Sequence, residues 1–224
     1  MAQQSFANVN TTTPGKLAVI EKQIRMRQRW QGQVMWAGRG VSLVGHSSQL
    51  QRHRDELLAY GIFEQNQYMV DWDEKVIFAL REEARRINFQ GHIVLGDINN
   101  VVRHFWKNGH QVDVIDYDDV GYLEYKHESL ITEACQRDVK LFNVVNTTRG
   151  NYWGLSQYLD NWRIKLDCQP YVHQRGNLAY SWGEIQRGAV QTIANNLGYE
   201  YRYWPYKGLS TMNVSMVIKP KYKS

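Results

Sequence analysis

Length, composition and charge already restrict what this chain can be. It has 224 residues, 43% of them hydrophobic, and its 27 basic against 22 acidic residues give a net charge of +5. This is enough chain for one domain with a proper buried core. It shows no 18-residue apolar run, no leader pattern, only two cysteines and no paired-histidine motif. We therefore expect a cytoplasmic protein without a disulfide framework, a metal site or membrane contact.

The predicted elements alternate between helix and strand. Residues 15–36 are expected to form a helix with apolar and basic faces. Five short apolar strands, separated by helical or mixed segments, are then predicted at 41–45, 68–71, 92–95, 112–115 and 141–145. This alternation predicts an α/β fold with a doubly wound parallel sheet. We divide the chain into an N-terminal tail and basic helix, 1–37, and an α/β domain, 38–224.

The C-terminal end breaks this alternation. A helix predicted over 182–197 is followed by two strands, 199–206 and 212–219, which only the short KGLST stretch joins. Such a connection is too short for a parallel crossover, so the last two strands must be antiparallel. A parallel α/β sheet finished by an antiparallel hairpin resembles the class I S-adenosylmethionine-dependent methyltransferase fold. The resemblance implies a mainly parallel, seven-stranded, Rossmann-like sheet.

Acids at the ends of the second and third strands carry this resemblance further. In YMVDWDE the family places a carboxylate that holds the cofactor ribose, which implies this role for Asp71, or for Asp73 as second choice. In HIVLGDINN the resemblance implies that Asp97 contacts the adenine amino group and that Ile98 packs near the ring. The alternative for each acid is helix N-capping, which any strand-to-helix turn can show.

The first turn departs most from the family. A glycine-rich turn would let the backbone approach the methionine part of the cofactor, but VSLVGHSSQ keeps only Gly45 and adds side chains from His46 onward. We assign both residues to the cofactor site. Two interpretations stay open, a rearranged pocket or a pocket that no longer binds cofactor. For His46, the alternative to a chemical role is capping or packing.

The fourth strand, VDVIDYDDVG, ends in three acids. It resembles the acid-x-acid-proline-aromatic-glycine motif of tRNA guanine-N2 dimethyltransferases. Asp116, Asp118 and Gly121 match that motif, while Asp119 replaces the proline. The resemblance implies that Asp116 and Asp118 orient an exocyclic amine for methyl transfer. Asn146, at the end of the fifth strand, is expected to face the same pocket.

Aromatic and basic residues favour a nucleic-acid partner. After the fifth strand, Tyr152 is predicted to stack on an extruded base and Arg149 to contact its phosphate. The N-terminal part is basic, with eight lysines and arginines against one acid in residues 1–54, which suits a polyanion. The phosphate-contact candidates there are Arg25, Arg27, Arg29, Arg39, Arg52 and Arg54. The alternative is an ordinary solvated helix face.

Two hypotheses of different classes follow. The first is an S-adenosylmethionine-dependent methyltransferase that acts on a nucleic acid. The second is a catalytically inactive, methyltransferase-like subunit that binds nucleic acid or supports assembly, and the VGHSSQ turn favours it. A nicotinamide-dependent oxidoreductase is disfavoured by the terminal hairpin and by the lack of a GxGxxG motif.

Overall fold

The computed structural model describes residues 14–118, 125–147, 171–172, 178–179, 190–207 and 211–219. The strands are β1 (Arg39–Leu43), β2 (Gln67–Asp71), β3 (His92–Leu95), β4 (Val112–Asp118), β5 (Leu141–Thr147), β6 (Tyr171–Val172), β7 (Leu178–Ala179), β8 (Glu200–Lys207) and β9 (Thr211–Ile218). Seven of them form one sheet in the order β3-β2-β1-β4-β5-β9-β8, while β6 and β7 pair separately. Strands β1 to β5 are parallel, and β9 is antiparallel to both β5 and β8. The predicted fold class, including the antiparallel hairpin, is confirmed.

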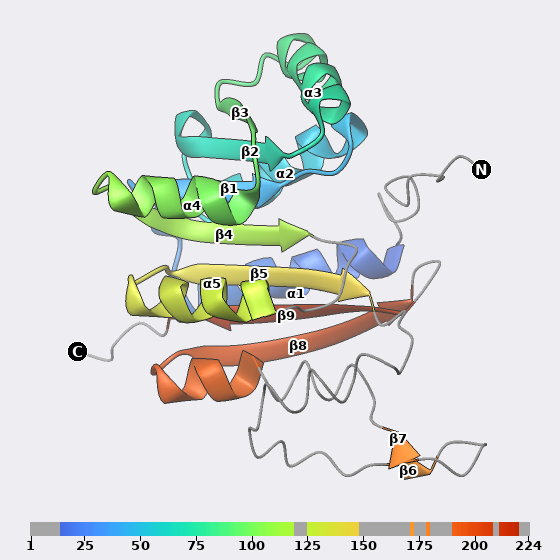
Figure 1. The fold of residues 1–224 in the computed structure, drawn as a ribbon, viewed down its shortest axis with the longest axis vertical. Coiled ribbons are helices and arrows are strands. Elements are labelled where there is room, and N and C mark those ends of the chain that lie inside the picture. Colours follow the sequence, from blue (N-terminus) through green and yellow to red (C-terminus); the bar gives the residue numbers. More distant parts are fainter. Residues whose placement is uncertain are drawn as a thin grey trace.

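Helices cover both faces of this sheet. They are α1 (Pro14–Gln31), α2 (Leu50–Ala59), α3 (Glu74–Arg86), α4 (Ile98–Lys107), α5 (Tyr125–Gln136) and a helix over 190–196, with short 3-10 turns η2 (Ser47–Gln49) and η3 (Glu64–Asn66). Figure 1 shows α4 and α5 in front of the sheet and α1 behind it. Each layer has its own apolar core, one lined by α4, α5 and 190–196, the other by α2 and α3. No helix in the described ranges is both long and apolar enough to cross a membrane.

Helix α1 packs against α2, β8 and β9 through a stripe that is mostly polar. Its buried residues recur every three or four positions, as helix geometry requires, and are Lys16, Val19, Gln23, Arg27 and Gln31. Buried polar groups need partners: Lys16 and Gln23 find them on β4 and β5, and Arg27 finds them in the turn that follows the helix. Gln31, for example, donates to the backbone oxygens of Lys140 (3.2 Å) and Lys219 (2.9 Å). The helix therefore docks on the sheet by hydrogen bonds as well as by packing.

The first helix ends five residues earlier than the sequence predicts, at Gln31 rather than at residue 36. Gly32 follows with a φ of +69°, the left-handed conformation that glycine adopts without strain after a helix. Arg27 fixes the reversal, because its guanidinium donates to the Gly32 oxygen at 2.6 Å and to that of Val34, and lies over the Trp36 ring. The chain then enters β1 at the centre of the sheet.

Candidate functional site

The carboxyl ends of the five parallel strands meet at one edge of the sheet, where open α/β sheets bind ligands. In Figure 1 this edge is on the right, at the arrowheads of β4 and β5. The sequence places its candidate residues here. The structure divides them into two groups, one along β1 to β3 and one around β4.

The turn after β1 leaves room at Gly45. Its two chain neighbours aside, a Cβ atom built on Gly45 would have no heavy atom of the described residues within 4 Å, and Gly45 does not have a positive φ. Neither packing nor backbone conformation in the described part of the chain therefore requires glycine at this position. The Nδ1 atom of His46 accepts the N–H of Ser48, two residues further along the chain, at 3.2 Å and caps η2. His46 acts as a cap in this structure.

The acids after β2 and β3 bind backbone N–H groups of the turns that follow them. Asp71 is buried and accepts the Asp73 N–H at 2.7 Å, and burial raises the pKa of its carboxyl. Asp73 caps α3, and Asp97 caps α4 by accepting the N–H groups of Asn99 and Asn100. The capping alternative therefore describes Asp73 and Asp97, while the cofactor roles of all three acids stay predictions.

Exposed apolar surface accompanies these acids. Trp72, directly after β2, is 73% exposed, and Leu95, the last residue of β3, is 46% exposed. Leu95 pairs with Asp71 across the two strands, so an apolar surface lies next to a buried carboxylate. Ile98 instead is buried in the core beneath α4, so packing of its side chain against a ligand at the edge is not supported. Sequence reasoning passed over Trp72 and Leu95.

The second group begins with a polar row across three strands. Ser42 of β1 is in register with Asp116 of β4, and Asp116 is in register with Asn143 of β5. All three side chains are buried. Ser42 donates to Asp116 Oδ2 at 2.8 Å, while Asn143 accepts from Gln23 and donates to the Tyr60 hydroxyl, both at 3.0 Å. The row therefore faces α1 and α2.

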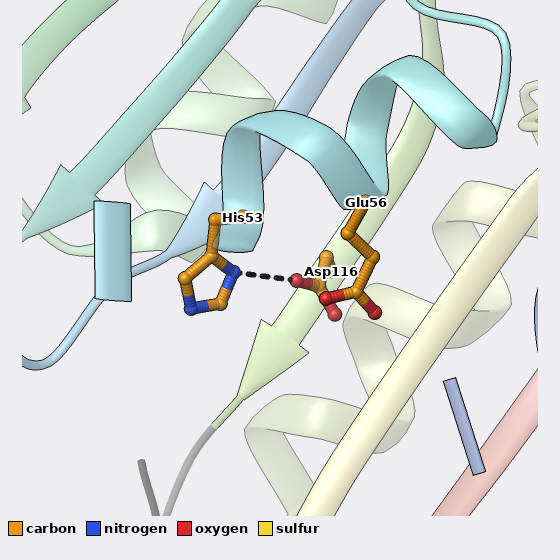
Figure 2. A group of neighbouring side chains, drawn as sticks. All are labelled: His53, Glu56 and Asp116. Atoms are coloured by element: carbon orange, nitrogen blue, oxygen red, sulfur yellow. Dashed lines mark hydrogen bonds and ion pairs between the residues drawn. The ribbon is translucent and has the colours of Figure 1, made fainter. Parts of the chain in front are cut away.

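Helix α2 supplies the partners of this row. His53 Nδ1 lies 3.0 Å from Asp116 Oδ2, as Figure 2 shows, and 2.7 Å from the Ser42 hydroxyl. Arg52 donates to His53 Nε2 at 2.8 Å and to Glu56 Oε2 at 3.1 Å. Burial, reinforced by the charge of Arg52, lowers the pKa of His53. His53 is therefore the neutral member of a charged cluster.

His53, Glu56 and Asp116 have the composition of a metal site, and one ligand atom from each lies within 4.8 Å of the others (Figure 2). The hydrogen bonds argue against that role. A guanidinium can only donate, so Nε2 of His53 accepts from Arg52 and the ring proton sits on Nδ1, facing Asp116. A metal-binding histidine needs the opposite arrangement, with a lone pair toward the carboxylates and an N–H toward an acceptor behind. The geometry describes a salt-bridge network.

Within this network, the pKa values of Asp118 and Glu56 are shifted in opposite directions. Lys16 and Arg52 both bind Asp118 Oδ2, Arg52 at 3.0 Å. Burial alone would raise the pKa of Asp118, but the charges of Lys16 and Arg52 outweigh it and hold that pKa well below its usual range. Glu56 receives the Tyr60 hydroxyl at 2.9 Å, and burial together with Asp116 raises its pKa to about 7. The cluster thus combines Lys16 and Arg52 with an Asp118 carboxylate that they keep ionised and with the Glu56 carboxyl, which is partly protonated near neutral pH.

The residues predicted to contact the substrate lie in different surroundings. Arg25 and Arg29 lie on the exposed face of α1, where Arg25 pairs with Glu21. Arg27 is buried at the helix end, so its assignment to phosphate is corrected. Arg149 and Tyr152, like Asp119 and Gly121, lie outside the described residues, and for Asn146 only the backbone in β5 is described.

Three further candidates for phosphate contact, Arg39, Arg52 and Arg54, are engaged within the protein. Arg39 lies over the rings of Tyr68 and Phe105, and Arg54 pairs with Glu64 at 2.8 Å. Arg52 is held by Asp118 and Glu56. The excess of basic residues in the first 54 positions therefore overstates the positive surface, because several of these charges are neutralised internally.

The strand order, the antiparallel hairpin and acids at successive strand ends define the class of fold. The protein has the fold of class I S-adenosylmethionine-dependent methyltransferases, which confirms the resemblance seen in the sequence. No protein-family model matches the sequence, and no curated protein matches it. The likeness therefore rests on structure.

Three solved structures illustrate it. An S-adenosylmethionine-dependent methyltransferase from Agrobacterium tumefaciens aligns with a TM-score of 0.55 at 12% identity, over 94% of this chain and 64% of its own. The methyltransferase domain of METTL16 has a TM-score of 0.53 at 11% identity, over 94% and 70%. A candidate rRNA methylase from Clostridium thermocellum has a TM-score of 0.51 at 10% identity, over 93% and 99%. At these identities the likeness is one of fold.

Proposed function

We propose that the protein transfers a methyl group from S-adenosylmethionine to a nitrogen atom of a nucleic-acid base. The observation that carries this proposal is the open space at Gly45, on the same edge as Asp71 and the exposed Leu95. A position that needs glycine for no internal reason is one where a ligand can approach the backbone. The space at Gly45 and the methyltransferase fold together support the proposal.

The residues along β1 to β3 fit the cofactor. Gly45 leaves space for its methionine part, Asp71 offers a carboxylate to the ribose hydroxyls, and Trp72 and Leu95 offer apolar surface to the adenine ring. Asp97 is exposed next to them and has acceptor capacity beyond its capping bonds. When bound, S-adenosylmethionine supplies an electrophilic methyl group on a sulfonium. The task of this chain is then to hold the acceptor nitrogen in line with that methyl group.

The acceptor side is built around Asp118. An ionised carboxylate at the strand end can accept an N–H of an exocyclic amine and aim the nitrogen lone pair at the methyl carbon. Methyl transfer at this site would form the N–C bond as the S–C bond breaks, and the nitrogen would then lose a proton to solvent. Because its pKa is held low, Asp118 orients the amine and is a poor base. Asp116, which is buried and bound by Ser42 and His53, supports the site from behind.

A nucleic-acid substrate is supported by two observations. The Clostridium protein of the same fold is described as a candidate rRNA methylase. The exposed face of α1 presents Arg25 and Arg29, and α1 begins at the carboxyl edge, where Lys16 reaches Asp118. Cations on that surface suit a phosphate backbone, and binding should weaken steeply as salt is added.

Calorimetric titration with S-adenosylmethionine and with its demethylated product tests the cofactor assignment. We expect both to bind. The substitution Gly45→Ala should weaken binding at least about tenfold, because a methyl group would enter the ligand space, and should leave unfolding unchanged. No binding to the unsubstituted protein at millimolar ligand would reject the enzyme and leave the inactive subunit as the better description.

The substrate class is tested separately by transfer of a labelled methyl group to bulk tRNA and to DNA. Transfer to neither, by a protein that binds the cofactor, would reject the nucleic-acid assignment. An anisotropy series with labelled single-stranded RNA, from low to high salt, should show a negative slope on a logarithmic plot. A flat slope would contradict the role of the basic α1 surface.

A further inference from the structure

Two cations from different helices converge on one oxygen of Asp118. Lys16 reaches it from the first turn of α1, 102 residues away in sequence, and Arg52 reaches it from α2. The three side chains are almost fully buried, with exposed fractions of 4% for Lys16, 12% for Arg52 and 10% for Asp118. Pairs in such surroundings are screened by solvent far less than surface pairs.

The position of Arg52 is fixed by more than Asp118. Its guanidinium also donates to Glu56 Oε2 and His53 Nε2, so its two terminal nitrogens are set by three acceptors. A planar fork held in this way is more rigid than a single ion pair. Lys16 belongs to a helix whose other buried polar residues, Gln23, Arg27 and Gln31, are hydrogen-bonded to the sheet and to the helix end. Both cations are therefore held in place, Arg52 by its three acceptors and Lys16 by the hydrogen bonds that fix α1.

The polar contacts of Asp118 within the described part of the chain all involve Oδ2. We propose that Lys16 and Arg52 are positioning residues of the acceptor site, which hold the Asp118 carboxylate ionised and fixed through Oδ2 so that Oδ1 accepts an N–H from the substrate. This inference rests on the proposed function. It adds α1 to the catalytic apparatus and narrows the acceptor to a group with a hydrogen-bond donor.

The charges near Asp118 favour a neutral amine as the acceptor. Around it lie Lys16 from α1, Arg52, His53 and Glu56 from α2, and Asp116 from β4. Two basic side chains, Lys16 and Arg52, face the Asp118 carboxylate, with Glu56, whose pKa is raised to about 7, beside them. A neutral amine adds no further charge to this arrangement. An anionic acceptor, such as a phenolate or a carboxylate, would add uncompensated negative charge to a buried site and is disfavoured.

The test compares Lys16→Met, Lys16→Arg and Arg52→Lys with Lys107→Met, whose lysine is exposed on α4. The first readout needs no substrate: the carboxyl carbon-13 resonance of Asp118, assigned with Asp118→Asn, is titrated with acid in the full chain. Lys16→Met should move the Asp118 midpoint upward, Lys16→Arg should restore it, and Lys107→Met should leave it unchanged. Should Lys16→Met not fold, Lys16→Gln keeps a donor without the charge and serves in its place.

The second readout is transfer of a labelled methyl group to bulk tRNA. Lys16→Met should lower kcat at least about tenfold and move the acid limb of the pH profile upward, with the cofactor Kd unchanged. Arg52→Lys should also lower kcat, because a point charge replaces the fork. An unchanged Asp118 midpoint in Lys16→Met, or an unchanged kcat, would overturn the positioning role. Absence of transfer by the unsubstituted protein would instead overturn the proposed function, and the Asp118 titration separates the two failures.

Discussion

The two halves of the carboxyl edge satisfy their acids in different ways. Along β1 to β3, Asp71, Asp73 and Asp97 accept N–H groups from the next two or three residues of the chain. Around β4, Asp116 and Asp118 are held by side chains that lie 63 to 102 residues away. In the first half the acids and their partners are close in sequence, whereas in the second half the fold brings distant residues together.

This difference has an energetic consequence. A carboxylate that binds the backbone of its own turn keeps its partner whenever the turn forms, so substitutions there act locally. A buried charge whose partner is a distant side chain depends on the docking of whole helices, and its loss leaves the partner charge uncompensated. We therefore expect the largest effects on stability in the β4 half and the smaller, ligand-specific effects in the β1 to β3 half.

The largest effect is expected at Arg52, the hub of the β4 half. Replacing it with methionine removes the cation shared by Asp118 and Glu56. Because these acids stay buried, Arg52→Met should lower the free energy of unfolding by about 3–5 kcal/mol. Denaturant unfolding, followed by the fluorescence of the eight tryptophans, measures it.

Arg86 on α3 is the matched control. It also pairs with a carboxylate, Glu83, but at the surface, where its side chain is 71% exposed. Exposed pairs contribute little, so Arg86→Met should unfold at the same denaturant concentration as the unsubstituted protein. Equal losses in the two variants would mean that the β4 network carries no special weight.

The next effect concerns the pH dependence of stability through Glu56. Its pKa is about 7 in the folded protein against an ordinary value of 4.5, so the folded state binds the proton more tightly. Its contribution to stability is complete below the ordinary pKa and disappears as the pH rises through about 7. Between about pH 5 and about pH 8, ionisation of this single group should lower the free energy of unfolding by roughly 2.5 kcal/mol.

Glu56→Gln removes that titration while keeping the shape of the side chain. Relative to the unsubstituted protein, the variant should gain stability at about pH 8 and gain little at about pH 5. Glu82→Gln changes an exposed position on α3. Its free energy of unfolding, plotted against pH, should run parallel to that of the unsubstituted protein. If the free energy of unfolding of Glu56→Gln also ran parallel to that of the unsubstituted protein across this pH range, the raised pKa of Glu56 would be contradicted.

The local half of the site and the frame of the sheet could be predicted because the signals are short-range. Apolar strands such as 112–115 show their burial in their composition, and the short link before β9 forces an antiparallel turn. Capping by Asp73 and Asp97 follows from their place before a helix. The end of α1 was missed, because a glycine in the left-handed conformation and the carbonyl contacts of Arg27 stop it there.

The network in the β4 half could not be assembled from the sequence, because its members meet only after α1 and α2 dock. Two signals were nevertheless present. His53 lies in the same helical stripe as Leu50 and Leu57, which are both in the core, so a polar residue interrupts an apolar face. Ser42 and Asn143 likewise interrupt apolar strands and come into register with Asp116. A buried polar residue inside an apolar pattern needs a partner, and Ser42 and His53 both find it in Asp116.

In the local half, Asp71 is expected to matter for ligand rather than for fold. Asp71→Ala should weaken binding of S-adenosylmethionine by about 1–3 kcal/mol, because it removes a charged partner of two ribose hydroxyls. Calorimetry on a variant with unchanged far-ultraviolet circular dichroism measures the loss. Unchanged affinity in the folded variant would remove Asp71 from the cofactor site.

The smallest effect decides between two roles at Asp97. Its carboxylate caps α4 by accepting the N–H groups of Asn99 and Asn100, so Asp97→Ala should cost about 1 kcal/mol of stability whether or not a ligand binds. Asp97→Ser keeps a good capping oxygen and removes the carboxylate. If Asp97 also accepts the adenine amino group, the serine variant should unfold like the unsubstituted protein but bind S-adenosylmethionine more weakly, by about 1 kcal/mol. Full affinity in Asp97→Ser, with weaker binding in Asp71→Ala, would show that Asp97 serves only the helix and that the adenine is held by apolar surface such as Leu95.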